Sequence, residues 1–185
     1  MEQDNTPLRG TPKVENSRIG KVVGEISCEE IRADDILPLL TFYQTLLPKI
    51  VQSYHPYGFA VTDKILQDGP FSRLNQGDEY AMVIRDRAGN IWGHAFLQKV
   101  LSKRPSFGIG IHQNLLGKGM GKQLMTAFFE GAKKKLDLEW IDLNVYENNT
   151  AACKLYQTMG FERIGETWDE NTGLKVLRMR KVMRR

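Results

Sequence analysis

Cysteine is scarce in this sequence. The 185 residues contain two, Cys28 and Cys153, and a pair so far apart makes neither a metal cluster nor a disulfide framework. No apolar run approaches the ~20 residues that a membrane span requires. The opening segment MEQDNTPLRGTPK also lacks the apolar core of a secretory signal. We therefore expect no metal site, no membrane association and a reducing, cytoplasmic setting.

Strong net charge is lacking as well. The formal charge of +4 fits an anionic ligand but does not demand nucleic acid, so no nucleic-acid partner is expected. The hydrophobic content of 41% is enough for the core of one domain. Residues 1–22 are polar without a hydrophobic repeat, which predicts a flexible N-terminal tail before a domain over residues 23–185.

Hydrophobic periodicity predicts strands and helices in a mixed order. Strands are expected at residues 25–32, 79–86, 90–100, 106–111, 140–146, 161–168 and 174–183. Helices are expected at 36–47 behind an Asp34/Asp35 cap, after the glycines of residues 114–124, and at 150–159. Residues 49–74 form a helical or irregular piece. This order indicates an α+β or α/β three-layer fold, with helices on both faces of a sheet.

The stretch NLLGKGMGKQL, residues 114–124, places three glycines before a helix. A nucleotide P-loop would need glycine at His112 or Leu116, and Ser or Thr after the lysine. A dinucleotide fingerprint would need glycine where Lys122 stands. Both of those phosphate-binding motifs are therefore excluded by spacing.

The same stretch still has the physical chemistry of an anion site. Alternate glycines let backbone N–H groups approach a ligand, and the helix start adds unpaired N–H groups and partial positive charge. Lys118 and Lys122 add charge at the rim. The alternative is a tight turn whose glycines serve packing. Gly108 and Gly110, inside the preceding strand, similarly indicate a bulge or a close approach to the backbone.

A second pattern lies downstream. Asn149, Ala152, Leu155, Tyr156, Gly160 and Phe161 form N-x-x-A-x-x-L-Y-x-x-x-G-F. Together with FGIGIHQNLLGKGMGKQL, this resembles the GCN5-related N-acetyltransferase (GNAT) superfamily, specifically over residues 105–165 and more weakly over 25–104. The resemblance implies a mixed, mostly antiparallel twisted sheet and acetyl-CoA as the acyl donor. Pairing of two copies as a homodimer is also compatible with it.

The resemblance also implies which residues bind acetyl-CoA. The pyrophosphate loop would be Leu116, Gly117, Lys118, Gly119, Met120 and Gly121, with Lys122 beside it. Leu116 departs from the family's Gln or Arg at the first position. The pantetheine arm would lie along Ile109, Gly110 and Ile111, and Asn149 would hydrogen-bond the cofactor from the head of its helix.

The implied reaction is transfer of the acetyl group to a primary amine by direct attack in a ternary complex. A backbone N–H of residues 109–111 would stabilise the developing oxyanion. Tyr156 would protonate the leaving thiolate as general acid. Because Tyr156 shares an apolar helical face with Ala152 and Leu155, a purely core role stays open.

The amine must lose a proton before it attacks, and at neutral pH this costs roughly 4.6 kcal/mol. Candidate bases are Asp142, Glu79, His94 and His112. A structural role would also explain each of these residues. Some ribosomal-protein acetyltransferases of the superfamily carry glutamate at the slot of Asn144, and asparagine is not a base.

The acceptor site is expected near the aromatic loop, which comprises Tyr54, His55, Tyr57 and Phe59. The basic last strand carries Lys175, Arg178, Arg180 and Lys181. These residues could attract an acidic acceptor, or they could simply form a solvent-exposed strand face. The acceptor is a small amine or, alternatively, a peptide N-terminus. A non-catalytic acyl-CoA-binding module is the alternative outside enzymes, and a nucleic-acid binder ranks last.

Overall fold

The computed structural model describes residues 22, 24–102 and 105–183. The predicted tail lies outside these residues, apart from Val22, which packs against the core. The described strands form one seven-stranded sheet in the order β1-β2-β3-β4-β5-β7-β6. They are β1 (Ile26–Glu30), β2 (Glu79–Asp86), β3 (Ile91–Gln98), β4 (Ser106–Ile111), β5 (Trp140–Tyr146), β6 (Glu162–Trp168) and β7 (Lys175–Val182).

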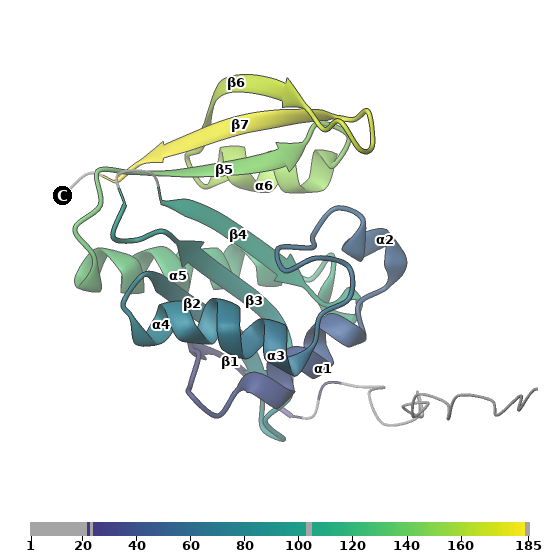
Figure 1. The fold of residues 1–185 in the computed structure, drawn as a ribbon, viewed down its shortest axis with the longest axis vertical. Coiled ribbons are helices and arrows are strands. Elements are labelled where there is room, and N and C mark those ends of the chain that lie inside the picture. The colour runs from purple at the N-terminus through teal and green to yellow at the C-terminus, as the bar shows by residue number, and fades with distance from the viewer. Residues whose placement is uncertain (1–21, 23, 103–104, 184–185) are drawn as a thin grey trace, which may run out of the picture.

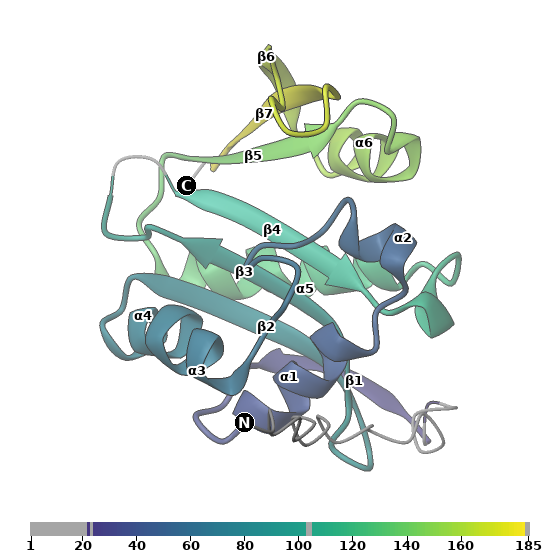
Figure 2. The ribbon, with the colours of Figure 1, turned by 45° about the vertical axis from the view of Figure 1, so that its right-hand side comes forward.

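Helices cover both faces of this sheet (Figures 1 and 2). They are α1 (Ile36–Gln44), α2 (Pro48–Val51), α3 (Asp63–Leu66), α4 (Ser72–Asn75), α5 (Met120–Lys135) and α6 (Thr150–Thr158), with a π-turn at Gln67–Phe71 and a 3-10 turn at Gln113–Leu115. Helices α1, α3 and α4 lie on one face, and α5 and α6 lie on the other. The predicted three-layer architecture is confirmed. None of the helices in the described residues is long and apolar enough to cross a membrane.

Helix α5 packs its apolar face onto the centre of the sheet. Its buried residues are Met120, Leu124, Met125, Phe128, Phe129 and Ala132. Fully burying a large apolar side chain contributes roughly 1.5–3 kcal/mol, so this one face anchors the helix strongly. The position of its N-terminus, next to the end of β4, follows from that anchoring.

Strands β4 and β5 diverge from each other. They are the parallel pair in an otherwise antiparallel sheet, and their register consists of one pair, Ser106 with Asp142. The Asp142 N–H donates to the Pro105 carbonyl at 3.1 Å. Beyond this point the strands splay apart, as Figure 1 shows. The β4 edge over residues 108–111 therefore has no strand partner on that side within the described residues.

Two local predictions about the N-terminal half are wrong. The first helix ends at Gln44 rather than near residue 47, and a short second helix follows from Pro48. Asp35 stands at the helix start without capping it through its side chain. Its carboxylate instead accepts from the Arg32 N–H at 2.7 Å and from the Arg85 guanidinium at 2.5 Å. A buried cation on β2 outcompetes the helix N–H groups for this anion.

Candidate active site

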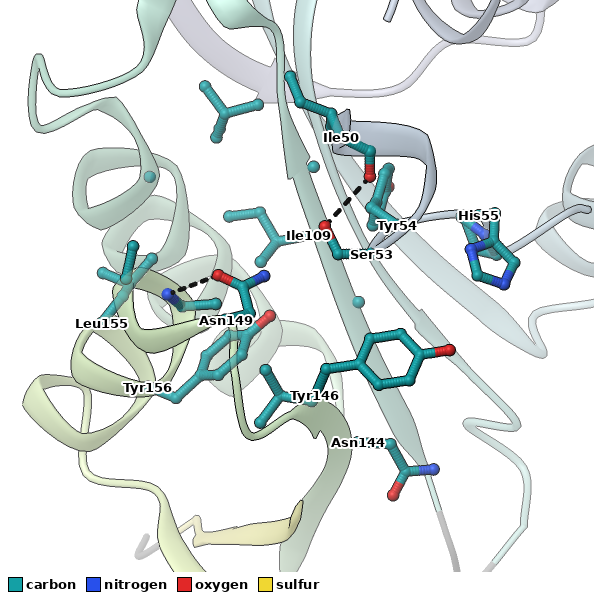
Figure 3. Close-up of a pocket in the computed structure, with 18 of the residues that line it drawn as sticks. Ile50, Ser53, Tyr54, His55, Ile109, Asn144, Tyr146, Asn149, Leu155 and Tyr156 are labelled. Carbon is teal, nitrogen blue, oxygen red and sulfur yellow. Dashed lines mark hydrogen bonds between the residues drawn. The ribbon is translucent and has the colours of Figure 1, made fainter. Parts of the chain in front are cut away.

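A cavity of about 1060 Å³ lies where β4 and β5 splay apart. Figure 3 shows Asn149, Leu155 and Tyr156 on one side of it, the strand bearing Ile109 behind it, and Ile50, Ser53, Tyr54 and His55 on the far side. Of the residues expected to bind acetyl-CoA, those that line this cavity are Ile109, Gly110, Ile111, Leu116, Gly117, Gly119, Met120, Gly121, Lys122, Asn149 and Tyr156. Lys118 does not line it. Its ammonium donates to the Asn114 carbonyl at 2.9 Å.

The glycine loop has stereochemical reasons for its composition. Gly117 and Gly119 adopt left-handed conformations, with φ of 73° and 75°. A Cβ on Gly121 would lie 3.1 Å from Leu155 Cδ2, so this glycine allows α5 to approach α6. The packing explanation and the anion-site explanation are therefore both compatible with the loop. Gly117 and Gly119 both shape the turn and leave their backbone accessible to a ligand.

The start of α5 presents unpaired amides. The first hydrogen bond of the helix runs from the Gln123 N–H to the Gly119 carbonyl at 3.1 Å. The N–H groups of residues 120–122 precede that bond and have no intrahelical acceptor. Nothing within 4 Å would meet a Cβ on Gly117 or Gly119, so the space over the loop is open. An anion fits this position on both charge and space.

The two strand glycines accommodate aromatic rings on the opposite face of the sheet from α5. A Cβ on Gly108 would lie 2.3 Å from Phe96 Cζ, and one on Gly110 would lie 2.1 Å from Tyr54 Cε1. The β3–β4 register runs without a shift, so the expected bulge is absent from this described pair. The close approach that the glycines indicate is made by side chains of the protein itself. Pairing of a ligand with the other edge of β4 stays a prediction.

Asn149 is held by the helix that it begins. Its Oδ1 accepts from the Ala152 N–H at 3.2 Å and caps α6, as the sequence predicts (Figure 3). Capping orients the side-chain NH₂ group, which keeps both of its hydrogens for another acceptor. A ligand carbonyl in the cavity would be such an acceptor.

Tyr156 is both a core residue and a residue of the cavity lining. Its ring is buried and packs edge-on against Phe161 with centroids 5.8 Å apart. The same residue lines the cavity, and its hydroxyl makes no hydrogen bond with the described residues. Burial, followed by the charge of Cys153, raises the pKa of the Tyr156 phenol. The phenol is therefore protonated at neutral pH.

The four candidate bases all lie outside the cavity lining. Both carboxylate oxygens of Asp142 accept hydrogen bonds from the Arg180 guanidinium, at 2.6 and 2.7 Å. His112 is buried, which lowers its pKa, and its Nδ1 accepts from the Asn114 N–H at 3.3 Å. These two side chains hold structure in place, and neither faces a substrate.

Glu79 and His94 belong to a buried polar cluster behind the cavity wall. The Glu79 carboxylate accepts from Arg73 at 2.8 Å and from the Tyr57 hydroxyl at 3.3 Å. Burial raises the pKa of Glu79 to about 7 and lowers that of His94 to about 3. His94 Nδ1 lies 2.9 Å from the hydroxyl of Tyr43, which the sequence analysis did not single out.

The far side of the cavity is aromatic and polar. Tyr54 and His55 line it, as predicted, whereas Tyr57 turns into the buried cluster and Phe59 stacks on His55 at 4.3 Å. The prediction missed a wall contributed by the other end of the chain. Its residues are Asn144, Tyr146, Thr167, Trp168, Asp169 and Val176. The turn DENTG marks where that wall folds back, but its sequence does not reveal what it faces.

The basic last strand is largely neutralised. Arg180 pairs with Asp142, and the Lys181 ammonium donates to the Met159 carbonyl at 2.6 Å at the end of α6. Lys175 lies 3.7 Å from both Glu147 and Glu166. Ordinary structural pairing accounts for these charges, so an acidic acceptor is not needed to explain them.

Solved structures with this architecture include acetyltransferases. The spermidine N-acetyltransferase of Vibrio cholerae, in complex with CoA and spermine, superposes with a TM-score of 0.71 at 20% identity, over 85% of this chain and 95% of its own. A GNAT-family acetyltransferase of Streptococcus pneumoniae gives 0.71 at 18% identity, over 86% and 100%. At these identities the likeness shows a shared fold.

The sequence itself identifies the family. The model of the acetyltransferase (GNAT) domain matches residues 50–183, and the chain belongs to that family. Shorter segments match a ribosomal-protein alanine N-acetyltransferase of Haemophilus ducreyi (29% identity over 90 residues, 49% of this chain) and the spermine/spermidine N(1)-acetyltransferase of Bacillus subtilis (36% over 56 residues, 30% of this chain). These matches span 61% and 37% of the relatives' own lengths.

Proposed function

We propose that the protein transfers the acetyl group of acetyl-CoA to a primary amine by direct attack in a ternary complex. The observation that carries this proposal is the single cavity of about 1060 Å³. It joins the glycine loop, Asn149 and Tyr156 on one side to Tyr54 and His55 on the other. One continuous space lets donor and acceptor be bound together, as direct transfer requires.

Each wall has a distinct task in this reaction. The amides at the start of α5 bind the diphosphate, and the open β4 edge pairs with the pantetheine arm. An N–H of residues 109–111 donates to the thioester oxygen as charge develops there. The amine nitrogen forms a bond to the thioester carbon, the carbon–sulfur bond breaks, and the Tyr156 phenol gives its proton to the departing sulfur.

Removal of the amine proton proceeds through water in this proposal. None of the four candidate bases lines the cavity, and its polar lining includes Ser53, Gln98, Ser106 and Asn144. These groups are suited to hold water that conducts the proton outward. Without a base in the cavity, the cost of roughly 4.6 kcal/mol for freeing the amine at neutral pH stays in the overall barrier, and it falls by about 1.4 kcal/mol for each unit that the pH rises.

The test is a panel of primary amines with detection of the free thiol of released CoA. Thiol release that depends on both acetyl-CoA and an amine supports the proposal. A panel without thiol release, beside calorimetric binding of acetyl-CoA, would instead favour the non-catalytic acyl-CoA-binding module.

A peptide N-terminus is the second candidate acceptor, because the Haemophilus ducreyi relative acts on a ribosomal-protein alanine. The asparagine at position 144 and the aromatic far wall favour a small amine. An alanine-initiated peptide in the panel decides between them. Turnover of that peptide well above every small amine would replace the first proposal with the second.

A further inference from the structure

The acceptor side of the cavity contains a carboxylate that the reaction does not use. Asp169, in the turn between β6 and β7, is the only acidic residue among the described residues that line the cavity. Tyr146, which lines the same wall, donates its hydroxyl proton to Asp169 Oδ2 at 2.5 Å. Figure 3 shows the Tyr146 ring extending away from Tyr156, on the side of His55. Asp169 therefore belongs to the acceptor half.

The charge of Asp169 is not cancelled by a cation. Its hydrogen-bond donors are all neutral. They are the Tyr146 hydroxyl, the Asn171 N–H at 2.9 Å, and the hydroxyl and N–H of Thr172. It forms no ion pair with the described residues. Lys175, its basic neighbour across the hairpin, lies between Glu147 and Glu166. The hydrogen bond from Tyr146 lowers the pKa of Asp169, so the carboxylate is ionised at neutral pH.

Aromatic side chains line the same cavity as this anion. Tyr54, His55, Tyr146 and Trp168 line the same half of the cavity. Aromatic faces attract cations, with a strength of about 0.5–2 kcal/mol depending on desolvation. The ammonium of Lys175 already lies over the Trp168 ring at 5.6 Å, so the other rings are the ones left for a ligand. A fixed carboxylate beside aromatic faces is a binding site for an organic ammonium.

We propose that Asp169 binds a second, protonated amine of the acceptor, so that the substrate is an aliphatic di- or polyamine. This inference rests on the proposed function and specifies its substrate class. One nitrogen of the acceptor is acetylated near Tyr156 while Asp169 and the Tyr146 ring hold the other. Asp169 also closes its turn by accepting from Asn171 and Thr172. That role is compatible with binding an ammonium, because neutral donors leave the negative charge of the carboxylate in place.

A lysine on the opposite wall suggests a competing hypothesis for the acceptor. Lys49, on α2, is exposed and also lines the cavity. If Lys49 governed selectivity, the acceptor would carry a carboxylate at its far end. Three acceptors of equal length separate the two cases: a six-carbon α,ω-diamine, the six-carbon monoamine and the six-carbon ω-amino acid. Diamines from three to eight carbons then give the spacing between the two amine sites.

The experiment compares kcat/KM for these acceptors in the wild-type chain and in Asp169→Asn. The wild type is expected to prefer the best diamine over its matched monoamine by about tenfold or more, since one ion pair of that strength is about 1.4 kcal/mol. The amino acid should be the poorest acceptor. Asp169→Asn should reduce the diamine-to-monoamine ratio to near one. Glu170→Gln removes the adjacent charge outside the cavity and should keep the wild-type ratio.

Failure of this inference differs from failure of the proposed function. Equal use of diamine and monoamine, preference for the amino acid, or an unchanged ratio in Asp169→Asn would overturn the role of Asp169 and leave amine acetylation intact. If no amine is turned over, calorimetry with the protein–CoA complex gives a second readout. Binding of the diamine that weakens about tenfold in Asp169→Asn supports the site, and equal binding by both proteins overturns it.

Discussion

The ring of Tyr54 lies where a side chain on Gly110 would have to be. A Cβ at residue 110 would stand 2.1 Å from Tyr54 Cε1. The Tyr54 hydroxyl lies 3.1 Å from that of Tyr43, which in turn contacts His94. The strand that we propose binds the pantetheine is thus packed against the buried polar cluster through one aromatic ring. Tyr54 and Tyr156 both line the cavity, and burial raises the pKa of the Tyr54 phenol.

Gly110→Ala should therefore destabilise the protein. The added methyl forces the Tyr54 ring to move, and overpacking of this kind costs about 1–3 kcal/mol. The expected result is a lower free energy of unfolding in urea, accompanied by a raised KM for the amine. Gly165→Ala is the control, because nothing within 4 Å would meet a Cβ there. In the double variant with Tyr54→Ala the destabilisation should be clearly less than additive. Strict additivity would contradict the contact.

Gly119→Val should weaken acetyl-CoA binding by more than about tenfold, because a branched side chain would fill the space over the amides of α5. Left-handed backbone also strains a β-branched residue, so the comparison needs a matched site. Gly89→Val provides it, since Gly89 has a φ of 88° and open space in a remote hairpin turn. Calorimetry should show near-normal affinity for Gly89→Val alone. Equal affinities for the two variants would argue against the loop assignment.

Tyr156→Phe should lower kcat more than it changes the affinity for acetyl-CoA. The ring packs on Phe161 while the hydroxyl makes no hydrogen bond with the described residues, so stability should change by less than about 0.5 kcal/mol. Loss of a general acid typically reduces the rate by about 10²–10⁴-fold. Steady-state kinetics and calorimetry together test this. Unchanged kcat would remove the acid role and favour the non-catalytic module.

The boundaries that the sequence predicted well belong to elements fixed by local chemistry. β2, β4 and β5 begin and end as expected, because runs rich in apolar residues are bounded by polar or turn-forming residues on both sides. The cap by Asn149 and the left-handed Gly160 at φ 82° likewise delimit α6 through neighbouring residues. The cofactor side of the site follows from these elements, which is why its residues converge on one cavity.

The features that were not predicted depend on partners far along the chain. Asp35 is drawn to Arg85, fifty positions away on β2, and no local pattern encodes that choice. The π-turn at Gln67–Phe71 contains Pro70, which lacks the N–H that a regular helix would use. Asp169 reaches the acceptor side only because β6 and β7 fold back beside β5. Periodicity reports which residues are buried but not what they contact.

The buried pair Glu79 and His94 should give opposite contributions to stability between about pH 5 and about pH 6.5. Glu79 has a pKa of about 7 when folded against 4.5 unfolded, so its contribution falls as pH rises between these values. His94 has a pKa of about 3 in the folded protein and 6.5 in the unfolded chain. Its contribution to stability therefore falls as the pH drops below 6.5. Each changes the free energy of unfolding by about 1–2 kcal/mol over that interval, and the two changes have opposite signs.

Glu79→Gln should expose the histidine contribution. Urea unfolding of this variant should show stability falling by about 1–2 kcal/mol from about pH 6.5 to about pH 5, whereas the wild type changes less. His94→Gln should show the reverse slope. A Glu79→Gln profile parallel to that of the wild type would mean that the carboxyl does not titrate in this range.

A crystal structure of the protein with CoA tests the central claim most directly. The account predicts that the diphosphate oxygens lie within about 3 Å of backbone N–H groups of residues 117–122. It also predicts that the pantetheine runs along the unpaired edge of β4 toward Tyr156. A diphosphate bound away from the start of α5, with the space between β4 and β5 left unfilled, would contradict it.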